Sequence, residues 1–158
     1  MDKQPWTTQQ TQTLEKLEIW DSRHVKPSPN HKHLRLYGHV LCPFVERVRL
    51  VLAAQGLQYQ DVQINLERRT RWHKSLNGGF VPILETPQES GTKGSHGLTI
   101  LESRIIMNYL DSKFGKTAKC GSLYAADPAE RAMQDMIMYK GDQVAMSLYS
   151  VLMHRGQD

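Results

Sequence analysis

A change of hydrophobic period around one cysteine is the strongest constraint on how this chain folds. Residues 34–36 place leucines on either side of an arginine, the two-residue period of a strand. After Cys42 the apolar residues recur at helical spacing over residues 43–55, and alternation returns over residues 62–66. Pro43 suits the first turn of a helix. This strand–helix–strand order predicts a parallel βαβ unit with the cysteine at the junction of strand and helix.

The pattern that follows predicts the rest of an α/β domain. Residues 67–76 are basic and compatible with a short helix, and residues 81–85 and 98–101 read as strands. These two strands are joined by a polar loop without a helix, so we expect them to be antiparallel. A helix then begins at Ser103 and ends at Gly115. The order β-α-β-α-β-β-α is that of a thioredoxin-like fold.

The chain divides by composition into four parts. Residues 1–32 are a polar N-terminal extension, residues 33–115 form the α/β domain and residues 116–126 are a linker. Residues 127–158 predict a long helix, because Asp127 suits the N-cap, with Pro at the first helical position and Glu at the third. We expect the apolar stripe of this helix to be a packing face.

Composition narrows the class of protein. The 158 residues include 20 Lys and Arg against 16 Asp and Glu, a net charge of +4, which permits anionic ligands but does not indicate nucleic acid. No apolar run approaches the roughly 20 residues of a membrane span, and the first 30 residues carry no secretory pattern. The two cysteines are too few to form a disulfide framework, so each is a candidate for a reactive thiol.

Cys42 is the candidate reactive group. A helix N-terminus presents unpaired N–H groups and a partial positive charge, both of which stabilise a thiolate. Val45 stands where a C-x-x-C dithiol would have its second cysteine, so any mixed disulfide needs an external thiol such as glutathione. A buried core cysteine is the alternative. His39 is a weaker candidate for the base of a Cys–His pair, since no third residue is apparent to orient it.

Two further pairs are candidates for ligand contacts. A cis bond between Val81 and Pro82 would turn the backbone of Val81 toward a peptide ligand, whereas an ordinary edge proline is the structural alternative. Ser103, after Glu102, suits a helix N-cap, and a helix N-terminus also binds carboxylates. The basic stretch over residues 68–74 is either a solvated face or an attraction for a ligand with several carboxylates.

Taken in order, these motifs resemble the glutathione transferases, and among them the omega class. The resemblance covers roughly residues 33–130. The residues that carry it are Cys42-Pro43-Phe44, Glu46-Arg47, Arg49-Leu50-Val51-Leu52, Gly56, Ile64-Asn65-Leu66, Trp72, Val81-Pro82-Ile83-Leu84-Glu85, Glu102-Ser103, Tyr109-Leu110-Asp111 and Asp127-Pro128.

The resemblance implies a thioredoxin-like domain that binds glutathione, followed by the beginning of an all-helical domain. It implies that Cys42 forms a mixed disulfide with glutathione and that Phe44 lines the site. Val81, with Pro82, would pair with the cysteinyl backbone of the tripeptide.

The remaining contacts that it implies lie at the two ends of the tripeptide. Glu102 and Ser103 would hold the γ-glutamyl end, and Arg69 would take the place of a family lysine near the glycyl carboxylate. Two departures from the family are a longer loop between Glu85 and Leu98 and a chain that ends about one helix into the helical domain, as in a truncated member.

The resulting prediction is an enzyme, a glutathione transferase of the omega type with thiol transferase and dehydroascorbate reductase-like activity. Glutathione is the co-substrate, no metal is needed, and the other substrates are small oxidised or electrophilic molecules. We expect a cytoplasmic protein with no nucleic-acid partner and no stable membrane insertion, and a homodimer is a possible assembly. The alternatives are a non-enzymatic, redox-sensitive protein resembling the chloride intracellular channel proteins, or an inactive truncated binding fragment.

Overall fold

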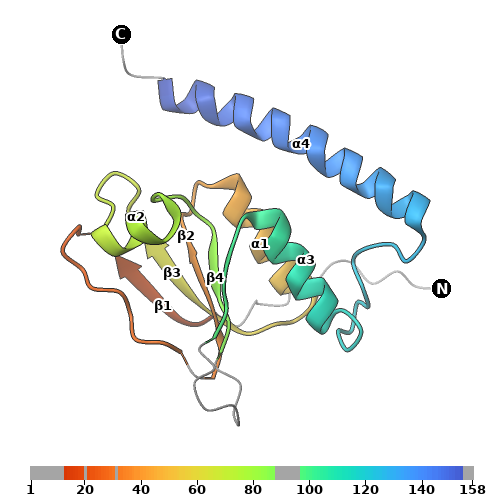
Figure 1. Ribbon diagram of the computed structural model, residues 1–158, viewed down its shortest axis with the longest axis horizontal. Helices are drawn as coiled ribbons and strands as arrows, with labels where there is room; N and C mark the ends of the chain where they lie inside the picture. Colours follow the sequence, from red (N-terminus) through yellow and green to blue (C-terminus); the bar gives the residue numbers. More distant parts are fainter. Residues whose placement is uncertain (1–12, 20, 31, 88–96, 155–158) are drawn as a thin grey trace, which may run out of the picture. The chain divides into compact units, whose positions relative to one another are not determined.

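A computed structural model describes residues 13–19, 21–30, 32–87 and 97–154 (Figure 1). The chain forms two compact units, Met1–Gly121 and Ser122–Asp158. The elements are β1 (Thr13–Ile19), β2 (Leu34–Gly38), α1 (Pro43–Ala54), β3 (Tyr59–Ile64), α2 (Arg71–Asn77), β4 (Ile83–Glu85), β5 (Thr99–Leu101), α3 (Ser103–Phe114) and α4 (Pro128–His154).

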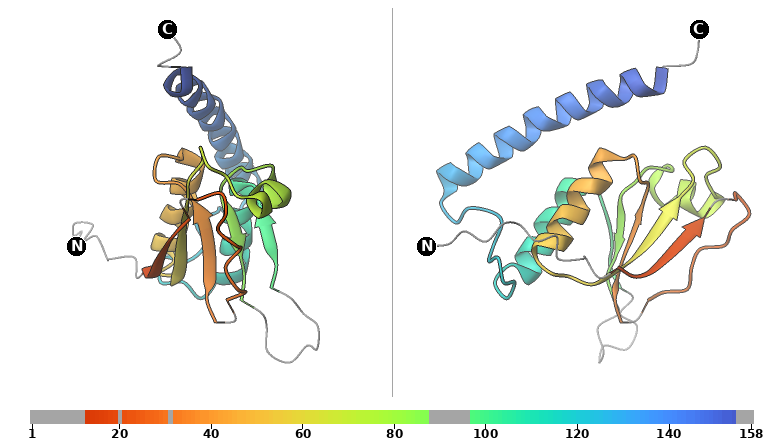
Figure 2. Two further views of the ribbon diagram at one scale, coloured as in Figure 1. Left: turned by 90° about the vertical axis from the view of Figure 1, so that its left-hand side faces the viewer. Right: turned by 180° about the vertical axis from the view of Figure 1, so that it is seen from behind.

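The first unit is built on one five-stranded sheet with the order β1-β3-β2-β4-β5. β2 and β3 are parallel, as the predicted βαβ unit requires, while β4 is antiparallel to both β2 and β5. Figure 2 shows α1 and α2 on opposite sides of this sheet. The element order predicted from residue 33 onward is therefore confirmed, and the fold is thioredoxin-like.

Strand β1 was not predicted. It pairs in parallel with β3, which places it at one edge of the sheet, within the segment expected to be a polar extension. Lys16 and Glu18 are exposed, as is common on edge strands. The return from β1 to β2 is held by the indole N–H of Trp72, which donates to the carbonyl oxygen of His24 at 3.1 Å, and by an ion pair of 2.6 Å between Lys26 and Glu85.

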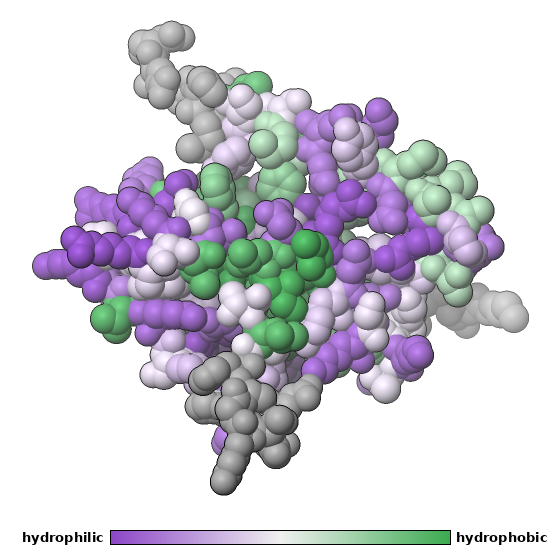
Figure 3. Space-filling view, viewed as in Figure 1, coloured by the Kyte–Doolittle hydropathy of each residue, from purple (hydrophilic) through white to green (hydrophobic). Residues whose placement is uncertain are grey.

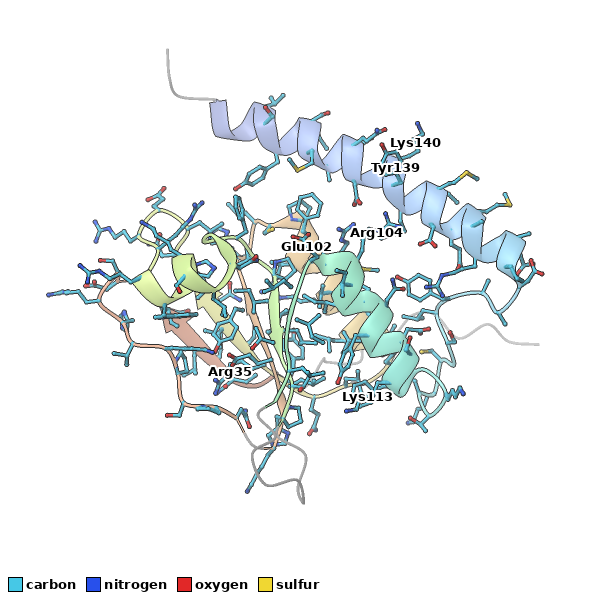
Figure 4. All side chains as sticks on the ribbon, in the orientation of Figure 1. Arg35, Glu102, Arg104, Lys113, Tyr139 and Lys140 are labelled. Carbon is cyan, nitrogen blue, oxygen red and sulfur yellow. The ribbon has the colours of Figure 1, made fainter. Side chains whose placement is uncertain are left out.

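Strands β2 and β3 are buried along their whole length, because they lie in the middle of the sheet and are covered on both faces. The alternation seen in the sequence therefore does not mark a solvent-exposed face. The buried guanidinium of Arg35 donates to Gln60 Oε1 at 2.5 Å and lies 3.3 Å from a carboxylate oxygen of Glu85 (Figure 4). Such partners are what a buried charge requires.

Helix α1 follows the sequence prediction closely. Its buried face carries Val45, Val48, Val51 and Leu52, which pack in the core between the sheet and α3. The chain leaves the helix through Gly56, whose φ of +66° is the left-handed conformation that favours glycine at this position.

Helix α2 begins later than the basic stretch suggested. The hydroxyl of Thr70 accepts a hydrogen bond from the backbone N–H of His73 at 3.2 Å, so Thr70 is the N-cap and residues 67–69 stay outside the helix. Gly78, with φ of +59°, follows the last helical residue. Part of the long loop after Glu85 lies outside the described residues, but its ends are joined, since the N–H of Thr86 donates to the carbonyl oxygen of Leu98 at 2.9 Å.

The surface of the first unit carries an apolar patch near the middle of the face shown in Figure 3, bordered by hydrophilic side chains. The exposed apolar side chains of this unit include Leu98, which precedes β5, and Ile105 in α3. A contiguous apolar patch on a surface is a candidate site of association with another molecule.

The second unit contains helix α4. One carboxylate oxygen of Asp127 accepts hydrogen bonds from the N–H groups of Ala129 and Glu130, each at 3.0 Å, which confirms the predicted N-cap. The apolar side chains expected to form a packing stripe are exposed; they include Met133, Ile137, Val144 and Leu148. Among the described residues, no helix combines the length and the apolar character needed to cross a membrane.

Candidate functional site

Cys42 is the N-cap residue of α1, immediately after the loop that leaves β2. Its backbone N–H donates to the carbonyl oxygen of His39 at 3.1 Å, and its own carbonyl oxygen accepts from the N–H groups of Val45 and Glu46. The residue is only 7% exposed. Its Sγ lies 3.9 Å from the carbonyl oxygen of Val81. The thiol is therefore fixed between the first turn of the helix and the start of β4.

The peptide bond between Val81 and Pro82 is cis, one of the two alternatives that the sequence left open. The residue before it is clamped by α2, because the carbonyl oxygen of Phe80 accepts from His73 Nε2 at 2.9 Å and from Asn77 Nδ2 at 3.2 Å. Val81 is thus held on both sides, by the clamp before it and by strand β4 after it.

His73 is a residue that the sequence analysis did not single out. A carbonyl oxygen can only accept, so the ring donates from Nε2, and in the neutral ring Nδ1 then carries no proton. Nδ1 is buried and has no hydrogen-bond partner among the described residues. Burial, together with the nearby charge of Arg69, lowers the pKa of His73. The neutral ring is therefore the form that holds Phe80 in place.

Ser103 is buried at the first position of α3, and Glu102 before it is exposed (Figure 4). The expected N-cap role of Ser103 is wrong, since Glu102 occupies that position and its side chain makes no cap hydrogen bond. The Ser103 hydroxyl instead accepts from Arg47 Nε at 2.9 Å, with Arg47 Nη2 also in contact. Glu102 has φ of +66° and ψ of 116°, an unusual backbone conformation for a residue other than glycine. Strained backbone conformations of this kind are found preferentially at functional sites.

Phe44 and Arg47 lie one turn apart on α1, and they connect the thiol to α3. The guanidinium carbon of Arg47 is 4.9 Å from the centroid of the Phe44 ring, within the range of a cation–π contact. Phe44 itself packs against the core that contains Cys42. Arg47 was part of the motif that carried the family resemblance, but it was not among the predicted site residues.

Arg69 lies beside Phe80, on the other side of the Val81 segment. Its guanidinium carbon is 6.0 Å from the Phe80 ring centroid, and its buried Nε has no hydrogen-bond partner among the described residues. A side chain at Gly79 would clash with it, because an added Cβ would stand 2.7 Å from Arg69 Cδ. The structure therefore brings Cys42 and Phe44 together with Ser103 and Val81, and places Arg69 next to the residue that precedes Val81.

The other candidates are not drawn into this arrangement. His39 Nδ1 accepts a hydrogen bond from the N–H of Leu41 at 3.2 Å, which occupies that lone pair within its own loop. Cys120 is exposed, and its Sγ is 3.3 Å from the carbonyl oxygen of Gly121. In the described part of the chain, no group of three His, Cys, Asp or Glu side chains is arranged to hold a metal ion.

Comparison with known proteins identifies the family of the chain. The family described as glutathione S-transferase, N-terminal domain, matches residues 32–112. Glutathione S-transferase omega-1 from Sus scrofa is 36% identical over 113 residues, which are 70% of this chain and 42% of that protein. Glutathione S-transferase omega-2 from Homo sapiens is 34% identical over 106 residues, 66% of this chain and 39% of that protein.

A solved structure extends the comparison. A glutathione transferase homolog from Drosophila mojavensis with bound glutathione superposes with a TM-score of 0.54 and 33% identity, covering 68% of this chain and 45% of that one. The chain belongs to the glutathione S-transferase family, and its similarity within that family is to the omega class. It spans about two fifths of the length of the curated relatives that it matches.

Proposed function

We propose that this chain binds glutathione beside Cys42 and acts as a glutathione-dependent thiol transferase and reductase. The observation that supports it most is the position of the thiol, at the N-terminus of α1 and 3.9 Å from the carbonyl oxygen of Val81. The helix terminus favours the thiolate, and the residue before Pro82 offers its backbone to a peptide. Cys42 and the backbone that would bind the peptide are therefore neighbours.

The remaining site residues suit the two charged ends of the tripeptide. Glu102 and Ser103 would take the γ-glutamyl end, because the exposed carboxylate of Glu102 complements an ammonium group and the N-terminus of α3 complements a carboxylate. Arg69 would take the glycyl carboxylate, and Phe44 would form the wall beside the thiol. The buried Nε of Arg69, which has no hydrogen-bond partner in the part of the chain that the structure describes, supports a ligand contact in this region.

The proposed reaction has two exchange steps. The Cys42 thiolate attacks the glutathionyl sulfur of a mixed disulfide, so that a bond forms between Sγ and glutathione while the substrate thiolate leaves and takes a proton from water. The thiolate of a second glutathione then attacks the glutathionyl sulfur on Cys42. Glutathione disulfide leaves and the Cys42 thiolate is restored. The net reaction converts the mixed disulfide and one glutathione molecule into the substrate thiol and glutathione disulfide.

The substrates that fit these two steps are low-molecular-weight mixed disulfides. Dehydroascorbate, another small oxidised molecule, has no sulfur to exchange, and its reduction to ascorbate would convert two glutathione molecules into glutathione disulfide. A single cysteine favours this redox chemistry over conjugation, since it becomes covalently bound to glutathione. Glutathione is an abundant cytosolic thiol, and we therefore propose action in the cytoplasm. The family resemblance leads us to expect a homodimer. Sedimentation of the purified chain would measure its oligomeric state.

The test is reduction of 2-hydroxyethyl disulfide by glutathione, with Cys42→Ser and Cys120→Ser as a matched pair. We expect the wild-type chain and Cys120→Ser to turn over at similar rates and Cys42→Ser to be inactive. Glutathione binding without turnover in all three proteins would favour a non-enzymatic binding protein of the same fold. Full activity of Cys42→Ser would contradict the proposal.

A further inference from the structure

Arg47 joins the two halves of the proposed site. It extends from α1 to α3, where Nε donates to the Ser103 hydroxyl at 2.9 Å and Nη2 contacts the same oxygen. Its guanidinium also lies over the ring of Phe44, two residues after Cys42. α1 and α3 pack on one shared core, so this contact spans residues that are 56 positions apart in the sequence.

The chemistry of the pair determines the direction of the hydrogen bonds. Arginine has donors only, whereas a serine hydroxyl has one proton and two lone pairs. The Ser103 oxygen must therefore accept from Arg47, and its proton is left to donate to a different group. The adjacent positive charge also strengthens the hydroxyl as a donor.

The N-terminus of α3 favours a carboxylate as the acceptor for this hydroxyl. Ser103 is the first residue of α3, a helix of 12 residues, so the hydroxyl stands next to N–H groups that also seek an acceptor. Ser103 is only 3% exposed, which restricts what else its proton can reach. An acceptor with negative charge satisfies the hydroxyl and the helix terminus together.

From this we infer that Arg47 is a positioning residue, which fixes the Ser103 hydroxyl as a hydrogen-bond donor to the α-carboxylate of the γ-glutamyl group. The inference rests on the proposed glutathione site. Arg47 would not touch the ligand; it would act through Ser103 and through Phe44, whose ring it covers. Its loss would weaken recognition of one carboxylate while leaving the Cys42 thiol in place.

Arg49 provides a matched control on the same helix. Its guanidinium points to β3, where Nη2 lies 3.2 Å from one carboxylate oxygen of Asp61 and 3.3 Å from the other. Replacing either arginine with methionine removes one positive charge from α1 and keeps the apolar stem. Only the change at Arg47 removes the contact with Ser103.

The experiment is calorimetric titration of the full chain with two ligands, glutathione and 4-aminobutanoyl-cysteinyl-glycine, which is glutathione without its α-carboxylate. We expect the wild-type chain to bind glutathione about tenfold more tightly than the shortened peptide, the size of a hydrogen bond to a charged group. Arg47→Met and Ser103→Ala should each lower this ratio to what the N–H groups at the N-terminus of α3 provide alone. Arg47→Lys keeps the positive charge with fewer oriented donors, so its affinity ratio should lie between those of the wild type and Arg47→Met. Arg49→Met should keep the wild-type ratio.

The outcomes separate this inference from the proposed function. If Arg47→Met keeps the wild-type ratio, or if wild-type affinity does not depend on the α-carboxylate, Arg47 has no positioning role although glutathione still binds. A wild-type chain that binds neither peptide would overturn the proposed function as well. Should Arg47→Met fail to fold, Arg47→Lys and Ser103→Ala decide the question, since both ratios must then fall below that of the wild type.

Discussion

The two units of this chain differ in how far they bury their apolar side chains. The first contains two buried apolar clusters on the two faces of the sheet, one toward α1 and α3 and one toward α2, besides exposed side chains such as Leu98 and Ile105. The second displays apolar side chains along α4, where Met133, Ile137, Val144 and Leu148 are all more than half exposed. The proposed site therefore stands on a well-packed sheet.

The largest expected difference is in the cost of removing a leucine from each unit. Leu36→Ala, at a fully buried position of β2, should lower the free energy of unfolding by about 2–5 kcal/mol, because it leaves a cavity. Leu148→Ala on α4 should change it by no more than about 0.5 kcal/mol, as is usual for surface positions. Urea denaturation of the two variants measures both values, and equal costs would show that α4 is buried in solution.

The two thiols extend the comparison to reactivity. Cys42 benefits from the N-terminus of α1, whereas Cys120 lies exposed just before the second unit begins. With one equivalent of iodoacetamide near neutral pH, we expect the label mainly on Cys42, roughly tenfold over Cys120 because only the thiolate reacts. Intact-mass analysis followed by peptide mapping measures the ratio. Label found mainly on Cys120 would mean that burial of Cys42 outweighs the effect of the helix terminus.

A third difference concerns how the two long helices begin. α4 relies on the Asp127 carboxylate, which accepts from two backbone N–H groups, whereas the side chain of Glu102, the N-cap residue of α3, makes no cap hydrogen bond. Asp127→Ala should therefore destabilise α4 by about 1 kcal/mol, while Asp127→Asn, which also caps well, should change little. Circular dichroism during thermal unfolding measures the loss. No difference between the two variants would mean that other contacts hold this terminus.

The sequence predicted those parts of the fold that depend on local chemistry. The start of α1 followed from Cys42 and Pro43, and that of α4 from Asp127 and Pro128, because caps and first-turn prolines act over a few residues. Strand β1 was missed since its charged residues give no strong alternation, and only its pairing with β3 identifies it.

The predictions that were wrong or missing concern contacts between residues that are distant in the sequence. Ser103 looks like a cap in sequence, but Arg47, 56 positions away, draws its hydroxyl into a different hydrogen bond. Arg35 looked like the polar face of a strand, yet its partner Glu85 is 50 positions further along the chain. No local pattern reveals either pairing, because each exists only once the sheet and helices have packed.

The smallest predicted effect concerns pH and the clamp that holds Val81. His73 is fully buried, and its ring donates from Nε2 the hydrogen bond to the carbonyl oxygen of Phe80 that forms the clamp. Protonation would place a charge on the buried Nδ1, which has no acceptor among the described residues. Burial and the nearby Arg69 accordingly lower the pKa of His73 below its ordinary value.

This lowered pKa makes the first unit less stable in mild acid. Above about pH 6.5, the ordinary value for histidine, the ring is neutral in both the folded and the unfolded chain and contributes no slope. Below it the unfolded chain takes up the proton first, so stability falls as the pH drops, until the folded ring is protonated as well. Urea denaturation at a series of pH values between 8 and 5 should show this decline, and His73→Gln, which keeps a donor for Phe80 but does not titrate, should reduce the slope. If the free energy of unfolding of that variant depends on pH as strongly as that of the wild type, the acid sensitivity comes from other groups. The hydrogen bond between His73 and Phe80 would then not depend on pH.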